Sequence, residues 1–188
     1  FAGAASAEDV KIGILIGFTG PIESLTGHMA NAAEAAMAEV NASGKAKNNY
    51  ISVRGDDTCT DAAAATAATE RAVTAEGVKG IIGGDCSGVT RAMLTNVAMP
   101  NGIVMVSPSA TSPALTSDPD NGLFFRTAPS DAREGEVMAD ILMEKGVKSI
   151  AFLAGNCVVV CVEPRGEGGR AWRWLRKHPD GVGSLVFE

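Results

Sequence analysis

Residues 11–18 read KIGILIGF, and residues 19–40 continue TGPIESLTGHMANAAEAAMAEV. The first stretch is a short apolar run of the length that a buried β-strand takes. In the second, apolar side chains recur at helical spacing, with Thr26 placed to cap the helix and Gly44 placed to end it. The positions that carry this spacing are Met29, Ala33, Ala36, Met37 and Val40. A strand followed by a helix predicts the first unit of an α/β fold.

The same strand-then-helix order recurs along the chain. Further strands are predicted at Tyr50–Arg54, Val78–Ile82, Gly102–Val106, Leu123–Arg126 and Ser149–Leu153. Helices are predicted from Thr60 or Asp61 to about Glu76, from Ser87 to before Pro100, and over Ser130–Lys145. These units predict a mostly parallel, Rossmann-like sheet with helices on both faces. Ligands bind at the carboxyl ends of the strands in such sheets, so the residues just after each strand are the candidates for function.

Composition argues against several classes of protein. Among the 188 residues, 16 Lys+Arg face 22 Asp+Glu, and the formal net charge of −6 argues against a nucleic-acid partner. A hydrophobic content of 46% is enough for a packed core, so a disordered chain is not expected. Because the chain holds only 2 His, we expect no His-rich metal centre, and no motif calls for a cofactor.

The third predicted strand runs into residues 83–90, which read GGDCSGVT. Free N–H groups at a helix start, together with the Ser87 hydroxyl, would suit a carboxylate. The alternative is that Ser87 only caps the helix. The stretch lacks the G-x-S-x-G spacing of a hydrolase nucleophile elbow, so serine catalysis is not favoured.

The fourth predicted strand runs into residues 107–113, which read SPSATSP. Two prolines stiffen a loop that is dense in hydroxyl groups and carries no ionisable side chain. Such a loop suits binding rather than catalysis, although an ordinary polar turn has the same composition. The sequence therefore favours a binding protein over an enzyme.

The competing interpretation is a Rossmann-like nucleotide-binding enzyme domain. Asp56 or Asp57, after the second strand, could take the place of a ribose-binding acid. The first turn, however, has Gly13, Gly17 and Gly20, which is not the G-x-G-x-x-G spacing of a dinucleotide site.

Four motifs together resemble one family. They are Thr19-Gly20-Pro21, Asp56-Asp57-Thr58-Cys59, Asp85-Cys86-Ser87 and Ser107-Pro108-Ser109-Ala110-Thr111. Their order and spacing are similar to those of periplasmic leucine/isoleucine/valine-binding proteins, the type I solute-binding proteins of ABC importers. The resemblance implies two α/β lobes that close on a small amino acid or amide-like solute and deliver it to an importer's membrane permease. It places lobe one at residues 8–128 and the start of lobe two at residues 129–153.

The resemblance also implies roles for particular residues. Ser87 and Thr111 would hold the α-carboxylate and α-ammonium of the solute with their hydroxyl groups. Ser109 would contribute its backbone carbonyl, and Ala110 lies between Ser109 and Thr111 in the same ligand-binding stretch. Where the family often has an aromatic residue after the Gly-Pro, this chain has Ser24-Leu25-Thr26, so the side chain of the solute stays open.

Two features bear on the compartment. Ala5-Ser6-Ala7 has the form of a signal-peptidase site, which makes residues 1–7 a signal-peptide remnant of an exported, periplasmic protein; the alternative is an Ala-rich terminus without that meaning. An oxidising compartment permits a disulfide, and we expect one between Cys59 and Cys86, on the assumption that the second and third strands are neighbours.

The sequence changes character near its end. Residues 154–188 depart from the family pattern and contain both tryptophans within an Arg- and Gly-rich stretch. We interpret this stretch as an aberrant or frameshifted tail, in which Val158–Val162 forms an improvised strand at most. The alternative is a genuine basic tail. Cys157 and Cys161 lack a second ligand pair, so no metal site is predicted there.

Overall fold

A computed structural model describes residues 8–147, 162–164 and 172–174 of the chain. Its main sheet has five parallel strands in the order β2-β1-β3-β4-β5. The strands are β1 (Asp9–Ile16), β2 (Asn49–Asp56), β3 (Gly80–Gly83), β4 (Val104–Ser107) and β5 (Phe124–Arg126). The predicted α/β architecture with a parallel sheet is thereby confirmed.

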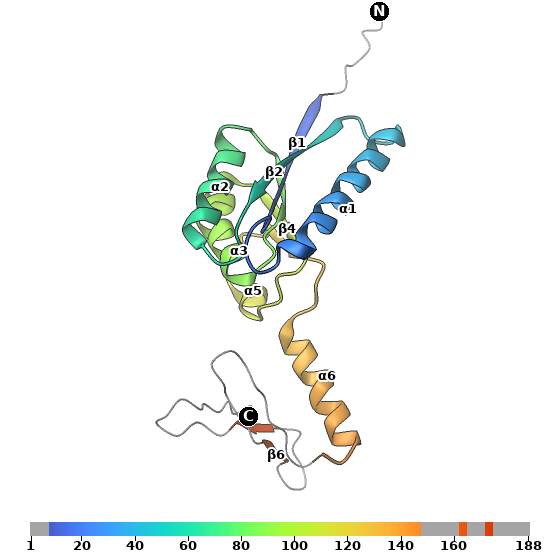
Figure 1. The fold of residues 1–188 in the computed structure, drawn as a ribbon, viewed down its shortest axis with the longest axis vertical. Helices are drawn as coiled ribbons and strands as arrows, with labels where there is room; N and C mark the ends of the chain where they lie inside the picture. The colour runs from blue at the N-terminus through green and yellow to red at the C-terminus, as the bar shows by residue number, and fades with distance from the viewer. Residues whose placement is uncertain (1–7, 148–161, 165–171, 175–188) are drawn as a thin grey trace, which may run out of the picture. The chain divides into compact units, whose positions relative to one another are not determined.

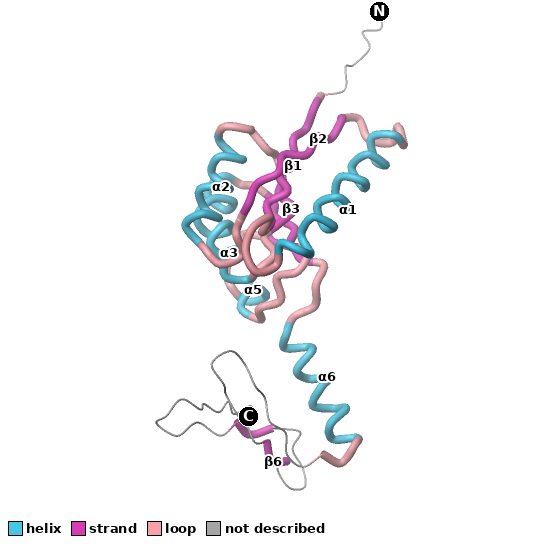
Figure 2. The backbone as a smooth tube through the Cα atoms, in the orientation of Figure 1, coloured by secondary structure: helices cyan, strands magenta, loops and turns pink. Residues whose placement is uncertain are grey.

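Helices cover both faces of this sheet. Figure 1 shows α1 on one side of the strands and α2 and α3 on the other, and the tube in Figure 2 shows the same three layers. The helices are α1 (Glu23–Ala42), α2 (Ala62–Thr74), α3 (Ser87–Met93), α4 (Met99–Asn101), α5 (Ala114–Ser117) and α6 (Asp131–Glu144). A π-helical segment, Leu94–Ala98, joins α3 to α4.

The central strand β1 explains why two layers of helix are needed. Successive side chains of a strand point to opposite faces, so its apolar run divides between two cores. Ile14 and Ile16 pack with Ala30 of α1. Leu15 joins the larger cluster, to which Ala65 of α2 also belongs. All these side chains are buried, and the run that appeared continuous in the sequence serves both faces of the sheet.

Several element boundaries differ from those predicted. The helix α1 begins at Glu23, so Thr26 lies inside its first turn and is not the cap. The buried Thr26 hydroxyl donates instead to the carbonyl of Gly17, 2.9 Å away, and thereby ties α1 to the end of β1. Asp61 does cap α2, as predicted, by accepting from the amides of Ala63 and Ala64.

The helix expected to stop before Pro100 continues past it. Proline lacks an N–H group, but Pro100 lies directly after the π-helical segment, where the amide of Met99 bonds to the carbonyl of Leu94 and the i−4 hydrogen-bond pattern is already interrupted. The helical run ends at Gly102, which adopts a left-handed conformation. The hydroxyl-rich segment after β4 is also not wholly a loop, because it contains the short helix α5.

The chain divides into two compact units, residues 1–131 and residues 132–188. In the second unit the described elements are most of α6 and the antiparallel pair β6 (Val162–Pro164) and β7 (Trp172–Trp174). None of the described helices is long and apolar enough to span a bilayer. The predicted signal remnant, the strand at 149–153 and Cys157 and Cys161 lie outside the described residues. Of the improvised strand only Val162 is described, as the first residue of β6.

Candidate solute-binding site

Three predicted motifs meet at one edge of the sheet. Gly17 follows β1, Ser87 follows β3 and begins α3, and the segment 107–112 follows β4. The order of the strands reverses between β1 and β3, because β1 connects outward to β2 whereas β3 leads on to β4. Ligands of open α/β sheets bind at this type of switch point, outside the carboxyl ends of the strands.

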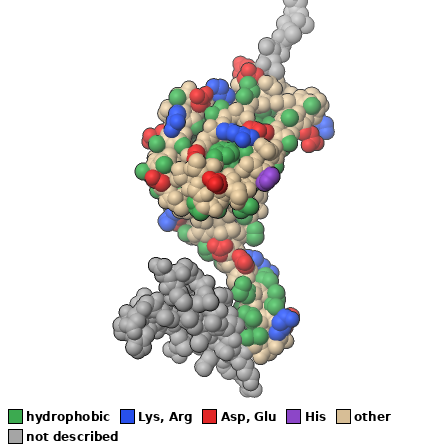
Figure 3. Space-filling view, in the orientation of Figure 1, with side chains coloured by type: hydrophobic (Ala, Val, Ile, Leu, Met, Phe, Trp, Pro, Cys, Tyr) green, Lys and Arg blue, Asp and Glu red, His purple; other side chains and the backbone are tan. Residues whose placement is uncertain are grey.

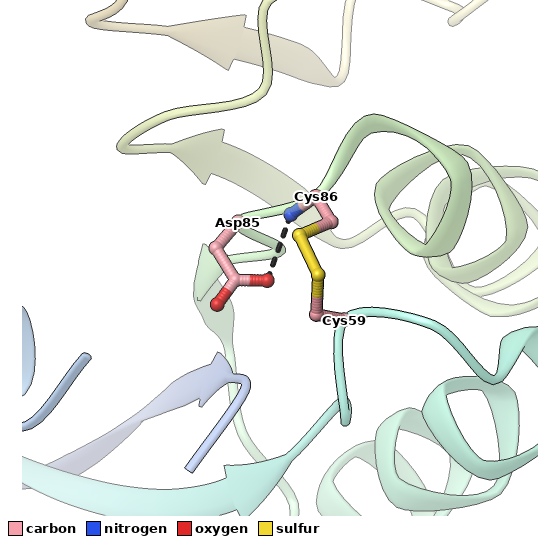
Figure 4. A group of neighbouring side chains, drawn as sticks. All are labelled: Cys59, Asp85 and Cys86. Carbon is pink, nitrogen blue, oxygen red and sulfur yellow. Dashed lines mark hydrogen bonds between the residues drawn. A yellow bond between two sulfur atoms is a disulfide. The ribbon is translucent and has the colours of Figure 1, made fainter. Parts of the chain in front are cut away.

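The disulfide between Cys59 and Cys86 is present at this edge (Figure 4). The assumption behind its prediction was wrong, because β2 and β3 are not neighbours: β1 lies between them. The bond therefore links segments that follow β2 and β3 across the end of β1. Asp85 completes the junction, because its carboxylate accepts from the amide of Gly17 at 2.7 Å and from the amide of Cys86 at 2.7 Å.

Ser87 does not cap α3. The N-cap position belongs to Cys86, and the Ser87 Oγ instead accepts from the amides of Thr111 and Ser112 at 3.2 and 3.1 Å. An oxygen that accepts two hydrogen bonds still has its own proton to donate. No acceptor for that proton is found in the part of the chain that the structure describes, so the Ser87 hydroxyl can donate to a ligand.

We call residues 107–112 the solute loop. Its amide groups are paired internally or with Ser87. The buried Ser107 Oγ accepts from the amides of Ser109 and Ala110, and it donates to the carbonyl of Gly84. Pro108 has no amide proton, and the amides of Thr111 and Ser112 belong to Ser87. No amide of residues 108–112 is therefore left for a ligand.

The carbonyl groups of the solute loop are paired with the segment 126–131, with one exception. The pairs are Thr127 N to Ser107 O at 3.0 Å, Thr127 Oγ1 to Pro108 O at 3.3 Å, Arg126 Nη1 to Ala110 O at 3.1 Å and Ser112 O at 2.9 Å, and Asp131 N to Thr111 O at 2.9 Å. The Ser109 carbonyl alone has no partner among the described residues. Two side-chain bonds also fix this loop: the Ser109 hydroxyl donates to the carbonyl of Asp85 at 2.9 Å, while Ser107 holds Gly84.

Three polar groups are therefore left for a ligand. They are the hydroxyl proton of Ser87, the carbonyl of Ser109 and the hydroxyl of Thr111, which also has no partner among the described residues. Two hydroxyl donors beside one carbonyl acceptor can pair with an anionic group and a cationic group on the same small molecule. Ser87, Ser109 and Thr111 are all half-buried, as expected for a site that stays accessible from one side.

The structure places all four predicted ligand-binding residues in one region but gives them different parts. Ala110 is fully buried, and both its amide and its carbonyl are already bonded, so it can position its neighbours but has no free polar group. The part played by Arg126 was not predicted, because the sequence indicated this residue only as the end of a strand. The signal available was a cation at the end of a strand beside a loop rich in carbonyl groups.

Two adjacent acidic residues, Asp56 and Asp57, lie at the end of β2, at the same edge of the sheet as the candidate site. Asp57 is buried, and burial together with the nearby charge of Asp85 raises the pKa of Asp57 to about 7. Burial alone would raise the pKa of Asp56 as well, but hydrogen bonds from Thr19 and the Thr58 amide outweigh it and lower that pKa. Asp56 therefore stays charged and holds the turn 17–20, whereas Asp57 lies in the interior.

The described residues contain one group with the spacing of metal ligands, Cys59, Asp85 and Cys86. Two of its three ligand atoms are joined in the disulfide, so they cannot act as thiolates. On the face drawn in Figure 3, acidic, basic and hydrophobic side chains are interspersed over the first unit and form no single basic patch.

Known proteins are similar to this chain in sequence. The family model described as "Periplasmic binding protein" matches residues 9–163. The Leu/Ile/Val-binding protein of Escherichia coli strain K12 is 34% identical over 146 residues, which are 77% of this chain and 39% of that protein. The chain thus spans about two fifths of the length of the curated relatives that it matches.

Solved structures are similar to this chain in fold as well. The substrate-binding protein LivJ of Streptococcus pneumoniae, in complex with isoleucine, has a TM-score of 0.66 and 27% identity over 73% of this chain and 39% of its own. An ABC transporter substrate-binding protein of Desulfitobacterium hafniense, complexed with Leu, has a TM-score of 0.63 and 28% identity over 74% of this chain and 40% of its own. The chain belongs to the periplasmic binding protein family. The family match extends past residue 153, and the interpretation of residues 154–188 as an aberrant tail stays a prediction.

Proposed function

We propose that this chain contributes the first lobe of a solute-binding protein that captures a small amino acid, or a related amide-like solute, for import by an ABC transporter. The observation that carries the proposal is the set of three unpaired groups at Ser87, Ser109 and Thr111. The hydroxyl groups of Ser87 and Thr111 donate to the α-carboxylate of the solute. The Ser109 carbonyl accepts from its α-ammonium.

The fixed geometry of the solute loop suits this task. Every other backbone polar group of residues 108–112 is already paired, so the three remaining groups are held in place before a solute arrives. Binding then costs little ordering of the protein. The site offers no nucleophile with a neighbouring base, and its free groups are hydroxyls and a carbonyl, which supports binding rather than catalysis.

The proposed location is outside the cytoplasm, and the proposed partner is the membrane permease of an importer. The disulfide at the same edge of the sheet supports an oxidising compartment, where such bonds persist. The export signal inferred from residues 1–7 belongs to the same proposal.

A cleft receptor gains affinity by enclosing its ligand, and ligand sites of this kind bury most of the ligand surface. One lobe leaves the carboxylate and ammonium of a solute partly hydrated, so each hydrogen bond contributes little net free energy. We therefore expect this 188-residue chain to bind its solute weakly, at millimolar rather than micromolar concentration.

A binding panel tests the proposed function. Saturation-transfer NMR on the purified chain, with leucine, isoleucine, valine, glycine, acetamide and urea, should show binding by at least one member and its displacement by another. NAD serves as the discriminating ligand, because an enzyme domain of the Rossmann type would bind it tightly. Binding of NAD with no response to any amino acid or amide would overturn the proposal.

A further inference from the structure

Arg126 binds carbonyl groups of the solute loop, whereas Ser87 binds its amide groups. Arg126 is the last residue of β5, and its guanidinium Nη1 donates to the carbonyls of Ala110 and Ser112 at 3.1 and 2.9 Å. Its Nη2 donates to the hydroxyl of Thr116, at 2.6 Å, at the end of the helix that follows the loop. The half-buried side chain therefore spans the loop and α5 with three hydrogen bonds.

Ser87 and Arg126 bind different polar groups of the solute loop. Ser87 Oγ accepts from the amides of Thr111 and Ser112, whereas Arg126 donates to the carbonyls on either side of Thr111. These contacts fix both peptide groups of Thr111, and with them the direction of the Cα–Cβ bond that carries its hydroxyl. Ser109, one residue before the first bridged carbonyl, is left with its own carbonyl unpaired.

The chemistry of this bridge requires arginine. A guanidinium is planar and carries five N–H donors in a fixed geometry, so one nitrogen plane can bind carbonyls that converge on it. In the described part of the chain Arg126 has no ion-pair partner: its hydrogen bonds go to carbonyl and hydroxyl oxygens, and the ion pairs found there involve other residues. The positive charge of Arg126 therefore interacts with the carbonyl dipoles of the solute loop.

We propose that Arg126 is a positioning residue for the solute loop: its bridge from Ala110 to Ser112 holds the Thr111 hydroxyl and the Ser109 carbonyl in the arrangement that receives a solute. The consequence for affinity rests on the proposed function. The consequence for loop order does not, because the hydrogen bonds are present without a solute.

Hydrogen–deuterium exchange on the solute-free chain tests the positioning directly. In Arg126→Gln, the amides of Ala110, Thr111 and Ser112 should exchange at least about tenfold faster, because the guanidinium that holds the loop carbonyls is lost. In Arg126→Lys the increase in exchange rate should be intermediate, because one ammonium group cannot reproduce the planar set of guanidinium donors. Arg71→Gln, which removes the same charge from the exposed surface of α2, is the matched control and should exchange like the wild type.

Protection of the β1 and β3 amides separates loop positioning from general destabilisation. If these amides lose protection to the same extent as the loop, or if loop exchange is unchanged in both Arg126 variants, the inference is overturned. Should Arg126→Gln fail to fold, the lysine variant decides the question by the same readout.

Titration of the same proteins with leucine then separates this inference from the proposed function. Weaker binding by Arg126→Gln, by about tenfold relative to Arg71→Gln, is expected. A wild-type chain that binds no amino acid or amide contradicts the proposed function, while the exchange data still decide the role of Arg126 in the loop. Equal affinity of the wild type, Arg126→Gln and Arg71→Gln contradicts the role of Arg126 in solute binding.

Discussion

The carboxylates of Asp57 and Asp85 converge on the backbone of Gly17. A side-chain carbon added to Gly17 would lie 3.2 Å from Asp85 Oδ2 and 3.3 Å from Asp57 Oδ1. Both acids are buried, and the amide of Asp85 also donates to Asp57 Oδ2 at 3.4 Å. Two carboxylates in so small a space cannot both ionise without a large electrostatic cost, so the pair favours holding one proton.

This pair predicts how stability changes with pH. Because burial and the charge of Asp85 raise the folded-state pKa of Asp57 from 3.8 to about 7, the folded protein holds a proton that the unfolded chain releases near pH 4. The stabilisation from this proton is complete below about pH 4 and is lost as the pH rises to about 7. We expect the melting temperature to fall by several degrees across that window, measured by differential scanning calorimetry.

Asp57→Asn supplies the comparison. The amide cannot ionise, so the decline between pH 4 and 7 should be much shallower than in the wild type. Asp9→Asn, at an exposed position of β1, is the matched control and should retain the wild-type decline. Parallel curves for the wild type and Asp57→Asn would show that this pair does not hold the proton.

The disulfide predicts a large loss of stability on removal. Cys59 and Cys86 are 27 residues apart, and closing a loop of this length stabilises a protein by about 3.5 kcal/mol in the chain-entropy model. The double variant with Ser at both positions should lose about that much free energy of unfolding in urea, and its midpoint should not respond to a dithiol reductant. Counting four reactive thiols in the denatured, unreduced wild type would contradict the bond itself.

Ser87 and Thr111 predict the largest effects on solute affinity. Replacing either residue removes one of the two hydroxyl donors to the solute carboxylate, at a cost of roughly 1–3 kcal/mol, or about 5- to 150-fold in dissociation constant. Ser87→Ala should be the more severe variant, because it also frees the amides of Thr111 and Ser112. Thr111→Val keeps the shape of the side chain and removes the hydroxyl alone. Thr66→Val, at a half-buried position of α2 away from the solute loop, controls for the loss of a threonine hydroxyl.

The edge strand β5 predicts self-association. Phe125 is 55% exposed, and it lies opposite Val106 in the register with β4, on the same face as the exposed Val104. Exposed apolar side chains on an unpaired strand edge favour pairing with another chain. Sedimentation velocity should show association that increases with concentration and is reduced in Phe125→Lys. A monomer throughout the concentration series would contradict this expectation.

Hydrophobic side chains also line α6, as Figure 3 shows, with Val137, Met138, Ile141 and Met143 exposed.

The sequence was sufficient for the order of the elements because their periodicity is local. The run 11–18 predicted β1, and the helical spacing after it predicted α1, although the helix begins before Thr26. Strand order was not predictable in the same way: Cys59 and Cys86 were expected to meet across neighbouring strands, and β1 in fact separates them. Which strands are neighbours depends on contacts between distant parts of the chain, and short-range patterns do not specify them.

In the candidate site, too, local patterns indicated some residues, whereas contacts between distant residues could not be predicted. Ser87, Ser109 and Thr111 could be named from their places after strands and from the family resemblance. Arg126 could not be assigned its partners, because Ala110 and Ser112 lie 16 and 14 residues away along the chain. Asp57 and Asp85, 28 residues apart, are brought together only when β1, β2 and β3 align their ends.

Site-resolved NMR tests the central claim most directly. The ¹⁵N-labelled 188-residue chain would be titrated with leucine to tens of millimolar, and separately with isocaproate, which has the carboxylate but no ammonium group. We predict saturable chemical-shift changes at the amides of Ser87 and residues 109–112, weaker with isocaproate and abolished in Ser87→Ala combined with Thr111→Val. Shifts confined to other parts of the chain, or equal shifts in that double variant, would contradict this prediction.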